Sequence, residues 1–595
     1  MLRQPWAVAA ALLVLLTYGA VLRIMPKGGF WSPDEGAKFI QLHSITWLDG
    51  LQYRIAYGGE RVDPDFAFYP TQCRFNDLYP ALTDDGGVKF HWPIWFPLGS
   101  QMAVAAFGLT GLYVVPLLSG WLVALAAGSL SRAWDPRLAP LAIIAVGLAT
   151  PIAFFSLTFW EHTLATTLGL VALVIVARAW PRPAFAPVVA TPLLFAAAAL
   201  RIELLPFGAA VLYAWWRARD LLPAERRRAG AAGVTIERRR ARIALGVVGV
   251  LALAWVLGDA MPERHRWMVG AVPSYLLSSF GKVPHVGAML TALLVDEAGN
   301  QAPEIPDVWR YAALVACLAI GIAPWLRSRR AESMVLLVAL AVLIEFSLYL
   351  IVRPQPYISL HGFVPIAPLT ILAVYALPPT WQRRLYAQRV IAGTAVLYLG
   401  AALAVLFIFL LSPEGSVPTG LEWGNRYLFT LYPLATVLAL AGVHELRRSQ
   451  RSALIKRTFT VAAAALFVCG LLLEVRGVWM LVETRRLVTA WEAALIDGPP
   501  VVTDVWWLPA AMAPLFVSQP VHCVSPATKL DTFLPVARTH GVDTFTFASF
   551  RPLETRHMQT AGFAASAEDE RVVSGLHLTR IRIAAPPAPA AAAAP

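Results

Sequence analysis

Charged residues are scarce in this chain: only 14% of its 595 residues are Asp, Glu, Lys or Arg, whereas 58% are hydrophobic. One soluble core needs far less apolar surface, so the composition excludes an ordinary soluble protein and indicates a polytopic membrane protein. The formal net charge is +12. The arginines cluster in short loops between apolar runs, which is the positive-inside pattern, so orientation in the membrane and not nucleic-acid binding explains the basicity.

Cysteine is also rare, with four in the chain. Their spacing does not match a zinc site. Cys317 and Cys469 fall in apolar runs, whereas Cys73 and Cys523 fall in loops that the topology below puts on the same side of the membrane. The sequence leaves open whether these two form a disulfide or stay free thiols. No repeat of the solenoid type is visible.

Apolar runs predict about thirteen transmembrane crossings, a few of them short, at about 1.5 Å of rise per residue. We therefore expect an all-α polytopic membrane domain over residues 1–478. The runs cover residues 6–25, 110–130, 138–156, 162–179, 186–200, 203–216, 243–260, 308–326, 333–352, 361–378, 390–412, 427–445 and 458–477.

The arginine-rich loops set the expected orientation. No small-residue cleavage site follows Trp6 to Ile24, so we predict an uncleaved anchor with a cytoplasmic N-terminus. The run His91 to Leu109 is apolar enough to cross, but a crossing there would put the arginine block 217–242 outside. We therefore expect this run to be interfacial or re-entrant, with the basic loops cytoplasmic.

The external side is then expected to include the loop 261–307, the tail after residue 478 and the first loop, 26–91. The loop is rich in aromatic and acidic residues, so we expect an ordered cap. In the tail, strands are predicted at 501–505, 521–524, 543–547 and 576–583 and a helix at 530–540, which makes 479–583 a small α/β domain. The Ala/Pro-rich end 584–595 is predicted to be disordered.

Asp34 and Glu35 are adjacent carboxylates just after the first apolar run. One interpretation is a solvated loop start that stops translocation. The other is a reactive pair, because proton abstraction or cation binding needs a carboxylate near a low-dielectric boundary, where its pKa can be tuned.

Two further polar groups begin at external helix ends. Lys89 is followed by the run His91-Trp92-Pro93, which could hold a phosphate at headgroup level or serve only as an aromatic belt. Glu161 and His162 open a helix; a carboxylate beside an imidazole could bind a divalent metal cation or take part in proton transfer.

Arginines mark the remaining candidates. Arg201, near Glu203, interrupts an apolar stretch, and an ionisable residue in a membrane is usually paired or lines a cavity. One external turn carries Arg353 and His361, and another carries Asn425 and Arg426. Arginine among amides and aromatics suits a pyrophosphate or phosphosugar ligand, although surface loops also contain such residues by chance.

This pattern resembles the GT-C superfamily of integral-membrane glycosyltransferases, such as the lipid A aminoarabinose transferases and the protein O-mannosyltransferases. The resemblance is carried by the Asp-Glu opening of the first external loop, the Trp/Pro-rich segment after it, about thirteen helices and the external α/β domain. It implies a polyprenyl-phosphate sugar donor, a lipid, glycan or protein acceptor, and a multi-pass location in a bacterial inner membrane.

The resemblance also implies residue roles. Asp34 matches the family's catalytic acidic residue in the first external loop, which acts as a general base. Glu35 stands beside it. Lys89 and His91-Trp92-Pro93 stand where relatives carry a Lys-Pro-Pro segment that meets the lipid phosphate. Glu161 and His162 occupy the second-loop position, where relatives carry Asp; dependence on a metal varies within the superfamily, so no cofactor is assigned.

Two readings from other classes compete with a transferase. A secondary transporter or lipid flippase would place its ionisable groups near the midplane, often in inverted repeats. An assembly scaffold that acts through the tail 479–595 would need neither the acidic pair nor the arginines.

Overall fold

The computed structural model describes residues 4–46, 51–73, 79–179, 185–221, 306–326, 328–353, 362–383, 385–410, 425–524, 529–553 and 565–583. The predicted span 243–260, most of the arginine block, His361 and the tail 584–595 lie outside these ranges. The chain divides into two compact units, residues Met1–Arg23 with Tyr113–Met480 and residues Ile24–Leu112 with Leu481–Pro595. The first loop, which we assigned to the membrane domain, therefore groups with the C-terminal segment.

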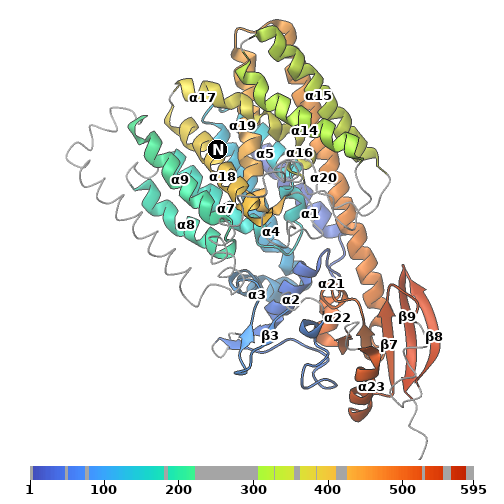
Figure 1. The fold of residues 1–595 in the computed structure, drawn as a ribbon. Coiled ribbons are helices and arrows are strands. Elements are labelled where there is room, and N and C mark those ends of the chain that lie inside the picture. Colours follow the sequence, from blue (N-terminus) through green and yellow to red (C-terminus); the bar gives the residue numbers. More distant parts are fainter. Residues whose placement is uncertain are drawn as a thin grey trace, which may run out of the picture. The chain divides into compact units, whose positions relative to one another are not determined.

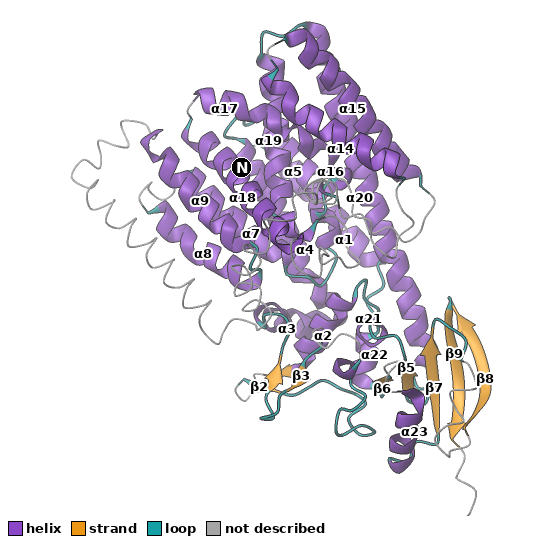
Figure 2. Ribbon diagram, viewed as in Figure 1, coloured by secondary structure: helices purple, strands orange, loops and turns teal. Residues whose placement is uncertain are grey.

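The described residues of the first unit form helices joined by loops, with no strand among them (Figure 2). Its helices are α1 Pro5–Ile24, α4 Val114–Ser131, α5 Leu138–Leu148, α6 Ile152–Phe155, α7 His162–Ala177, α8 Ala186–Leu200, α9 Leu204–Ala218, α14 Asp307–Ile322, α15 Arg329–Val352, α16 Phe363–Ile366, α17 Leu377–Arg383, α18 Tyr386–Leu410, α19 Leu431–Arg448 and α20 Ala453–Leu495, whose last turns belong to the second unit. Its 3-10 helices are η3 Arg219–Leu221, η6 Ala323–Trp325, η7 Pro368–Ala376 and η8 Arg426–Leu428.

Six helical segments among the described residues are long and apolar enough to cross a membrane, by length and composition. The protein is thus mostly helical and multi-pass, while the expected number of about thirteen crossings stays a prediction. The six segments are Pro5–Ile24, Trp95–Ser131, Val308–Trp325, Arg329–Val352, Tyr386–Ala404 and Ala453–Leu495, beside the shorter apolar helices Leu138–Leu148, His162–Ala177 and Ala186–Leu200.

The predicted run 361–378 is not one regular helix. It forms α16, then the 3-10 helix η7, and enters α17. Pro365, Pro368, Pro378 and Pro379 lack the N–H that a continuous α-helix needs at each turn, so the helix is interrupted.

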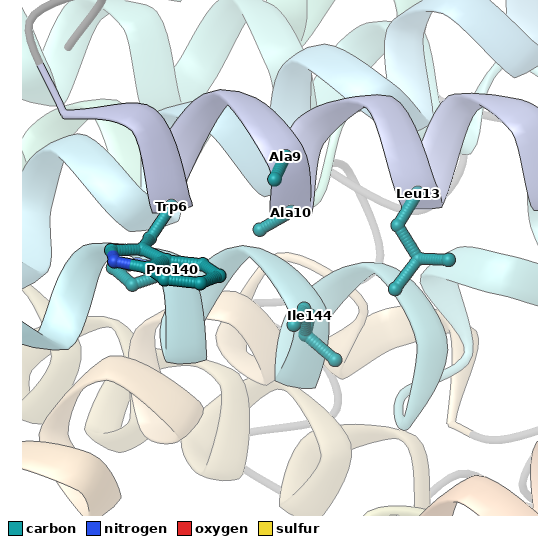
Figure 3. Close-up of a pocket in the computed structure, with 6 residues that line it drawn as sticks. All are labelled: Trp6, Ala9, Ala10, Leu13, Pro140 and Ile144. Atoms are coloured by element: carbon teal, nitrogen blue, oxygen red, sulfur yellow. The ribbon is translucent and has the colours of Figure 1, made fainter.

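Helix α1 packs on α4 and α5 through small residues. Ala10 and Val14 of α1 lie in one buried cluster with Ala124 and Ile143. Beside this seam, Figure 3 shows Trp6 on α1 above Pro140 of α5, where they line an apolar groove. Trp6 is 78% exposed, as suits an aromatic anchor at a membrane interface.

The predicted cytoplasmic loops meet at one end of the bundle. Tyr386 at the start of α18 donates a hydrogen bond to the carbonyl of Val176 near the end of α7, 2.9 Å away. Gln388 donates to the carbonyl of Ala133 after α4, at 3.0 Å. These segments carry Arg132, Arg178 and Arg389, and their cytoplasmic side stays a prediction.

The second unit joins the first loop to the C-terminal segment. From the loop come α2 Pro33–Ser44, the hairpins β1 Ile45–Thr46 with β2 Gln52–Tyr53 and β3 Ala81–Leu82 with β4 Val88–Lys89, η1 Pro70–Gln72, α3 Trp95–Phe107 and η2 Gly108–Tyr113. From the C-terminal segment come β5 Val501–Thr503, α21 Leu508–Ala511, α22 Ala513–Ser518, β6 Val521–Cys523, α23 Lys529–Thr539, β7 Thr544–Ser549, β8 Ala565–Val573 and β9 Leu576–Ile583.

The C-terminal strands form a five-stranded sheet of order β6-β5-β7-β9-β8, with α23 beside it (Figure 1). Strand β5 pairs in parallel with β6 and β7, and β9 is antiparallel to β7 and β8. The predicted strands and helix correspond to β5, β6, β7, β9 and α23. The sequence prediction missed β8, because its run Ala565–Val573 is highly charged; Glu568 of this strand pairs with Arg580 and Arg582 of β9.

Three contacts fasten the first loop to this sheet. Cys73 and Cys523 form a disulfide, with Cα atoms 6.3 Å apart, which settles the pairing that the sequence left open. Phe68 packs edge-on against Phe533 with ring centroids 5.1 Å apart. The backbone N–H of Cys523 also donates to the carbonyl of Phe68 at 2.9 Å.

A buried polar network lies next to the disulfide. Tyr57 donates to Asp63 at 3.0 Å, and its hydroxyl oxygen lies 2.6 Å from Nδ1 of His522. Because the Tyr57 proton goes to Asp63, His522 donates from Nδ1. Burial lowers the pKa of His522 to about 3, so this ring is neutral at neutral pH.

The disulfide predicts a large loss of stability on removal. We expect Cys73→Ser with Cys523→Ser to lower the free energy of unfolding of the second unit by about 2 to 5 kcal/mol, because the unfolded chain regains freedom. Thermal unfolding in detergent measures this, with Cys317→Ala as the control, since Cys317 is unpaired. Recovery of both Cys73 and Cys523 as alkylated thiols from unreduced, denatured protein would contradict the pairing.

His522 predicts a dependence of stability on pH. Its folded pKa lies below the unfolded value of 6.5, so the unfolded chain binds more protons and stability falls as the pH drops from 6.5 toward 3, by up to about 1.4 kcal/mol per unit. His522→Asn keeps a donor toward Tyr57 and does not titrate. The melting temperature of this variant should fall less between pH 7 and pH 4.5 than that of the wild type; equal falls would contradict a neutral buried His522.

Candidate functional site

The acidic pair opens a helix, α2, and not a loop. Ser32 is its N-cap, accepting a hydrogen bond from the N–H of Glu35 at 3.3 Å, and Pro33 takes the first helical position. Asp34 and Glu35 occupy the first turn, where the helix dipole favours negative charge. Of this pair, Glu35 is buried and Asp34 is half-buried.

Glu35 forms a buried ion pair with Arg485 of α20. Its Oε1 lies 2.5 Å from Nη2 of Arg485, and neither side chain is exposed. Its Oε2 accepts a hydrogen bond from the N–H of Trp31 at 3.0 Å. Both carboxylate oxygens of Glu35 are thus engaged, which fixes the start of α2 against α20.

The helix is enclosed by its neighbours in the second unit. Nine of its 12 residues are buried. A Cβ at Gly36 would overlap the carbonyl oxygen of Ala510 in α21, so only glycine allows this approach. At the other end, Gln101 of α3 donates to the carbonyl of Leu42 at 2.9 Å. Asp34 is therefore a partly open carboxylate on a rigid, buried helix.

The structure brings α2 together with the second predicted motif. Lys38, one turn after Asp34, is 2% exposed and its Nζ lies 4.2 Å from the ring centroid of Trp92. Gln41 donates to the carbonyl of Trp92 at 2.8 Å. The ring of His91 stacks edge-on against Trp92 with centroids 4.3 Å apart. Lys89, in β4, is exposed.

Sequence reasoning missed Lys38 and Arg485. The N-cap signature Ser32-Pro33 was available and predicts a helix on which residue 38 follows residue 34 on one face. The partner of Glu35, 450 residues away, has no signal in a single sequence.

In the first unit, Arg201 at the end of α8 contacts polar side chains at the starts of α7 and α9. Its Nη1 lies 3.0 Å from Oε1 of Glu161 and 3.4 Å from Nδ1 of His162, both at the start of α7. It also pairs with Glu203 at the start of α9. Of the two roles that the sequence left open for Arg201, these contacts show pairing, because its guanidinium is shared between two carboxylates.

Aromatic rings enclose this cluster. Trp160 stacks on the His162 ring with centroids 5.0 Å apart, and Phe155 lies 4.9 Å from the same ring. Phe429, just after η8, lies 4.7 Å from Phe155. The rings lower the local dielectric and strengthen the charge pairing of the cluster.

Arg426 lies near this cluster. It is close enough to Arg201 for the two positive charges to repel, and its guanidinium sits 5.2 Å from the ring centroid of Tyr427. Asn425 is the N-cap of η8, with its side chain accepting from the N–H groups of Tyr427 and Leu428, each at 3.1 Å. Asn425 thus holds the turn that presents Arg426.

Arg353 lies at the end of α15. Its guanidinium sits 6.0 Å from the ring centroid of Tyr349, and its carbonyl accepts a hydrogen bond from Arg476 at 2.6 Å. The other predicted ligand of that turn, His361, is outside the described residues.

The predicted metal site has an unusual donor set. Glu161 and His162 already face the guanidinium of Arg201, whose positive charge opposes a divalent cation at the same atoms. Within the described ranges, no group of three or more His, Cys, Asp or Glu side chains is arranged to hold a metal ion. Glu161 and His162 are therefore better suited to pair with the guanidinium of Arg201 than to bind a metal ion.

No protein-family model matches the chain, and neither does any curated protein. Solved structures of an oligosaccharyltransferase from Archaeoglobus fulgidus are similar to it. The apo form has a TM-score of 0.46 and 12% identity, over 92% of this chain and 70% of that chain. A complex of that enzyme, AglB, with an inhibitory peptide and a dolichol-phosphate has a TM-score of 0.43 and 12% identity, over 92% and 69%.

These neighbours, described as oligosaccharyltransferases, have TM-scores of 0.46 and 0.43 to this chain. At 12% identity, residue roles are not transferable from them. The roles in this chain have to follow from its own side chains.

The ion pair at the start of α2 predicts an asymmetric response to substitution. Arg485→Met leaves the Glu35 carboxylate buried without its counter-charge, so we expect a loss of about 3 to 5 kcal/mol in the free energy of unfolding. Arg486→Met, in an exposed pair with Glu483, should cost at most about 1 kcal/mol. Thermal unfolding in detergent compares the two variants.

Adding Glu35→Gln to Arg485→Met should recover part of the loss, because the buried charge is gone. Equal stabilities for the Arg485 and Arg486 variants would contradict the role given to the buried pair.

Proposed function

We propose that this protein is a membrane glycosyltransferase that moves a sugar from a polyprenyl-phosphate-linked donor to an acceptor on the extracytoplasmic side. The observation that carries the proposal is the placement of Asp34, a half-buried carboxylate on a helix that is otherwise enclosed. A general base needs this combination of rigidity and access. The resemblance of the sequence to the GT-C superfamily supplies the reaction class.

In the proposed reaction, Asp34 accepts the proton of the acceptor hydroxyl or amine as that group attacks the anomeric carbon of the donor. A bond forms between the acceptor atom and the anomeric carbon. The bond from that carbon to the phosphate oxygen breaks, and the polyprenyl phosphate leaves with the electron pair. A single displacement of this kind inverts the anomeric configuration.

Two groups of residues are proposed to bind phosphate, one in each unit. In the second unit, Lys89 and His91 are predicted ligands of the donor phosphate beside α2. In the first unit, Arg201 and Arg426 carry like charges, and an anion bound to both guanidinium groups would stabilise them. Glu161 and Glu203 hold Arg201 in place. Arg353 and His361 stay predicted donor-binding residues.

The transporter alternative is less well supported. A transporter or flippase places its charged site near the membrane midplane. The cluster around Arg201 lies at the starts of α7 and α9 and the end of α8, which we assign to the extracytoplasmic face. We place the protein in a bacterial inner membrane with the acceptor, a lipid, a glycan or a protein, on the outer side.

If Asp34 is the base, its removal should lower the turnover number. Asp34→Asn should lower kcat about 10²- to 10⁴-fold, because the side chain keeps its size but cannot take a proton. The assay follows transfer of labelled sugar from a panel of synthetic polyprenyl-phosphate sugars to membrane acceptors. Asp84→Asn, at an exposed position of the same loop, is the control and should keep full activity.

Measuring the binding of a lipid phosphate distinguishes the role of the base from that of a phosphate ligand. Asp34→Asn should bind undecaprenyl phosphate as the wild type does, whereas Arg426→Gln should bind it at least tenfold more weakly. Normal transfer by Asp34→Asn would remove Asp34 from the role of base. Unchanged binding by Arg426→Gln would remove the proposed phosphate site.

A further inference from the structure

The first turn of α2 carries two negative charges, and each has a positive residue placed for it. Glu35 meets Arg485 across the interface with α20. Lys38 follows Asp34 by four residues and Glu35 by three, so it shares a helix face with both, but Glu35 is already paired with Arg485. The acidic residue precedes the basic one, which is the favourable order for such a pair.

Burial makes Lys38 unusual. A lysine on a helix surface normally extends into water, but only 2% of Lys38 is exposed. A buried ammonium is costly unless other groups stabilise it. Here the indole face of Trp92 lies under the Nζ at 4.2 Å, and Trp92 is itself fixed by the hydrogen bond from Gln41 to its carbonyl. The ammonium is thus held in one place, one turn from Asp34.

We infer that Lys38 is a positioning residue for Asp34: its ammonium, clamped on Trp92, holds the Asp34 carboxylate in the orientation in which it takes the acceptor proton. The inference rests on the proposed role of Asp34 as the base. It adds a second residue to that site and gives Trp92 a function as the clamp of Lys38 instead of a phosphate contact.

Other charges around α2 do not replace Lys38. Four of the elements that pack on α2, namely α3, α21, α22 and β1, contain no Asp, Glu, His, Lys or Arg, and α20 contributes Arg485. The remaining nearby groups are Glu35 with Arg485, Lys27, whose pKa burial lowers to about 8, His91 beside Trp92, the exposed Lys89 and the exposed His43 at the far end of α2. Lys38 is the cation that shares a helix face with Asp34.

The test separates turnover from binding in the sugar-transfer assay. In Lys38→Met, kcat should fall about tenfold or more, because a carboxylate that is not held in place is less often oriented for the acceptor proton. KM and the binding of undecaprenyl phosphate should stay as in the wild type. Lys38→Arg keeps a positive charge at this position and should restore kcat toward the wild-type value.

Controls separate positioning from folding. Arg61→Met removes an exposed positive charge from the same loop and should leave kcat unchanged. If Lys38→Met does not fold, Trp92→Leu keeps the ammonium but removes the ring that holds it, and should lower kcat by a smaller factor. Folded Lys38→Met or Trp92→Leu protein with the kcat of the wild type overturns the inference. Full activity in Asp34→Asn overturns the proposed base instead.

Discussion

The second unit depends on one buried interaction, the ion pair between Glu35 and Arg485. Burying two charges is expensive, and a well-packed apolar pair would often give equal or greater stability. Such a pair is therefore better understood as a device that fixes geometry. Glu35 has a single place in which both its oxygens are satisfied, by Arg485 and by the N–H of Trp31. That place sets the start of α2, and with it the position of Asp34.

Further ties between distant parts of the sequence support this placement. The disulfide of Cys73 with Cys523 and the contact of Tyr57 with His522 both join the first loop to β6. A loop that is tied to the C-terminal sheet at several points can hold a reactive group rigidly, whereas a free loop could not. In the first unit, Arg201 at the end of α8 connects the starts of α7 and α9 through its ion pairs with Glu161 and Glu203.

Local patterns predicted the elements of this protein better than their contacts. Apolar runs and short β-branched segments such as Val501–Thr503 are local patterns of a few residues. They therefore predicted apolar helices and most strands of the sheet. The charged strand β8 was missed because its stability comes from pairing with β9. The same holds for the candidate site. Asp34 was predictable from its residue type and its position after the first apolar run. The burial of Lys38 was not, because it depends on Trp92, 54 residues away.

The central claim is that the chain binds a lipid-linked phosphate at the Arg201 end of the helical unit. Photo-crosslinking with a polyprenyl phosphate that carries a diazirine next to the phosphate tests it most directly. The account predicts crosslinked peptides that contain Arg201 or Arg426, and their loss in Arg426→Gln. Crosslinks confined to the opposite end, around Arg132 and Arg389, would contradict it.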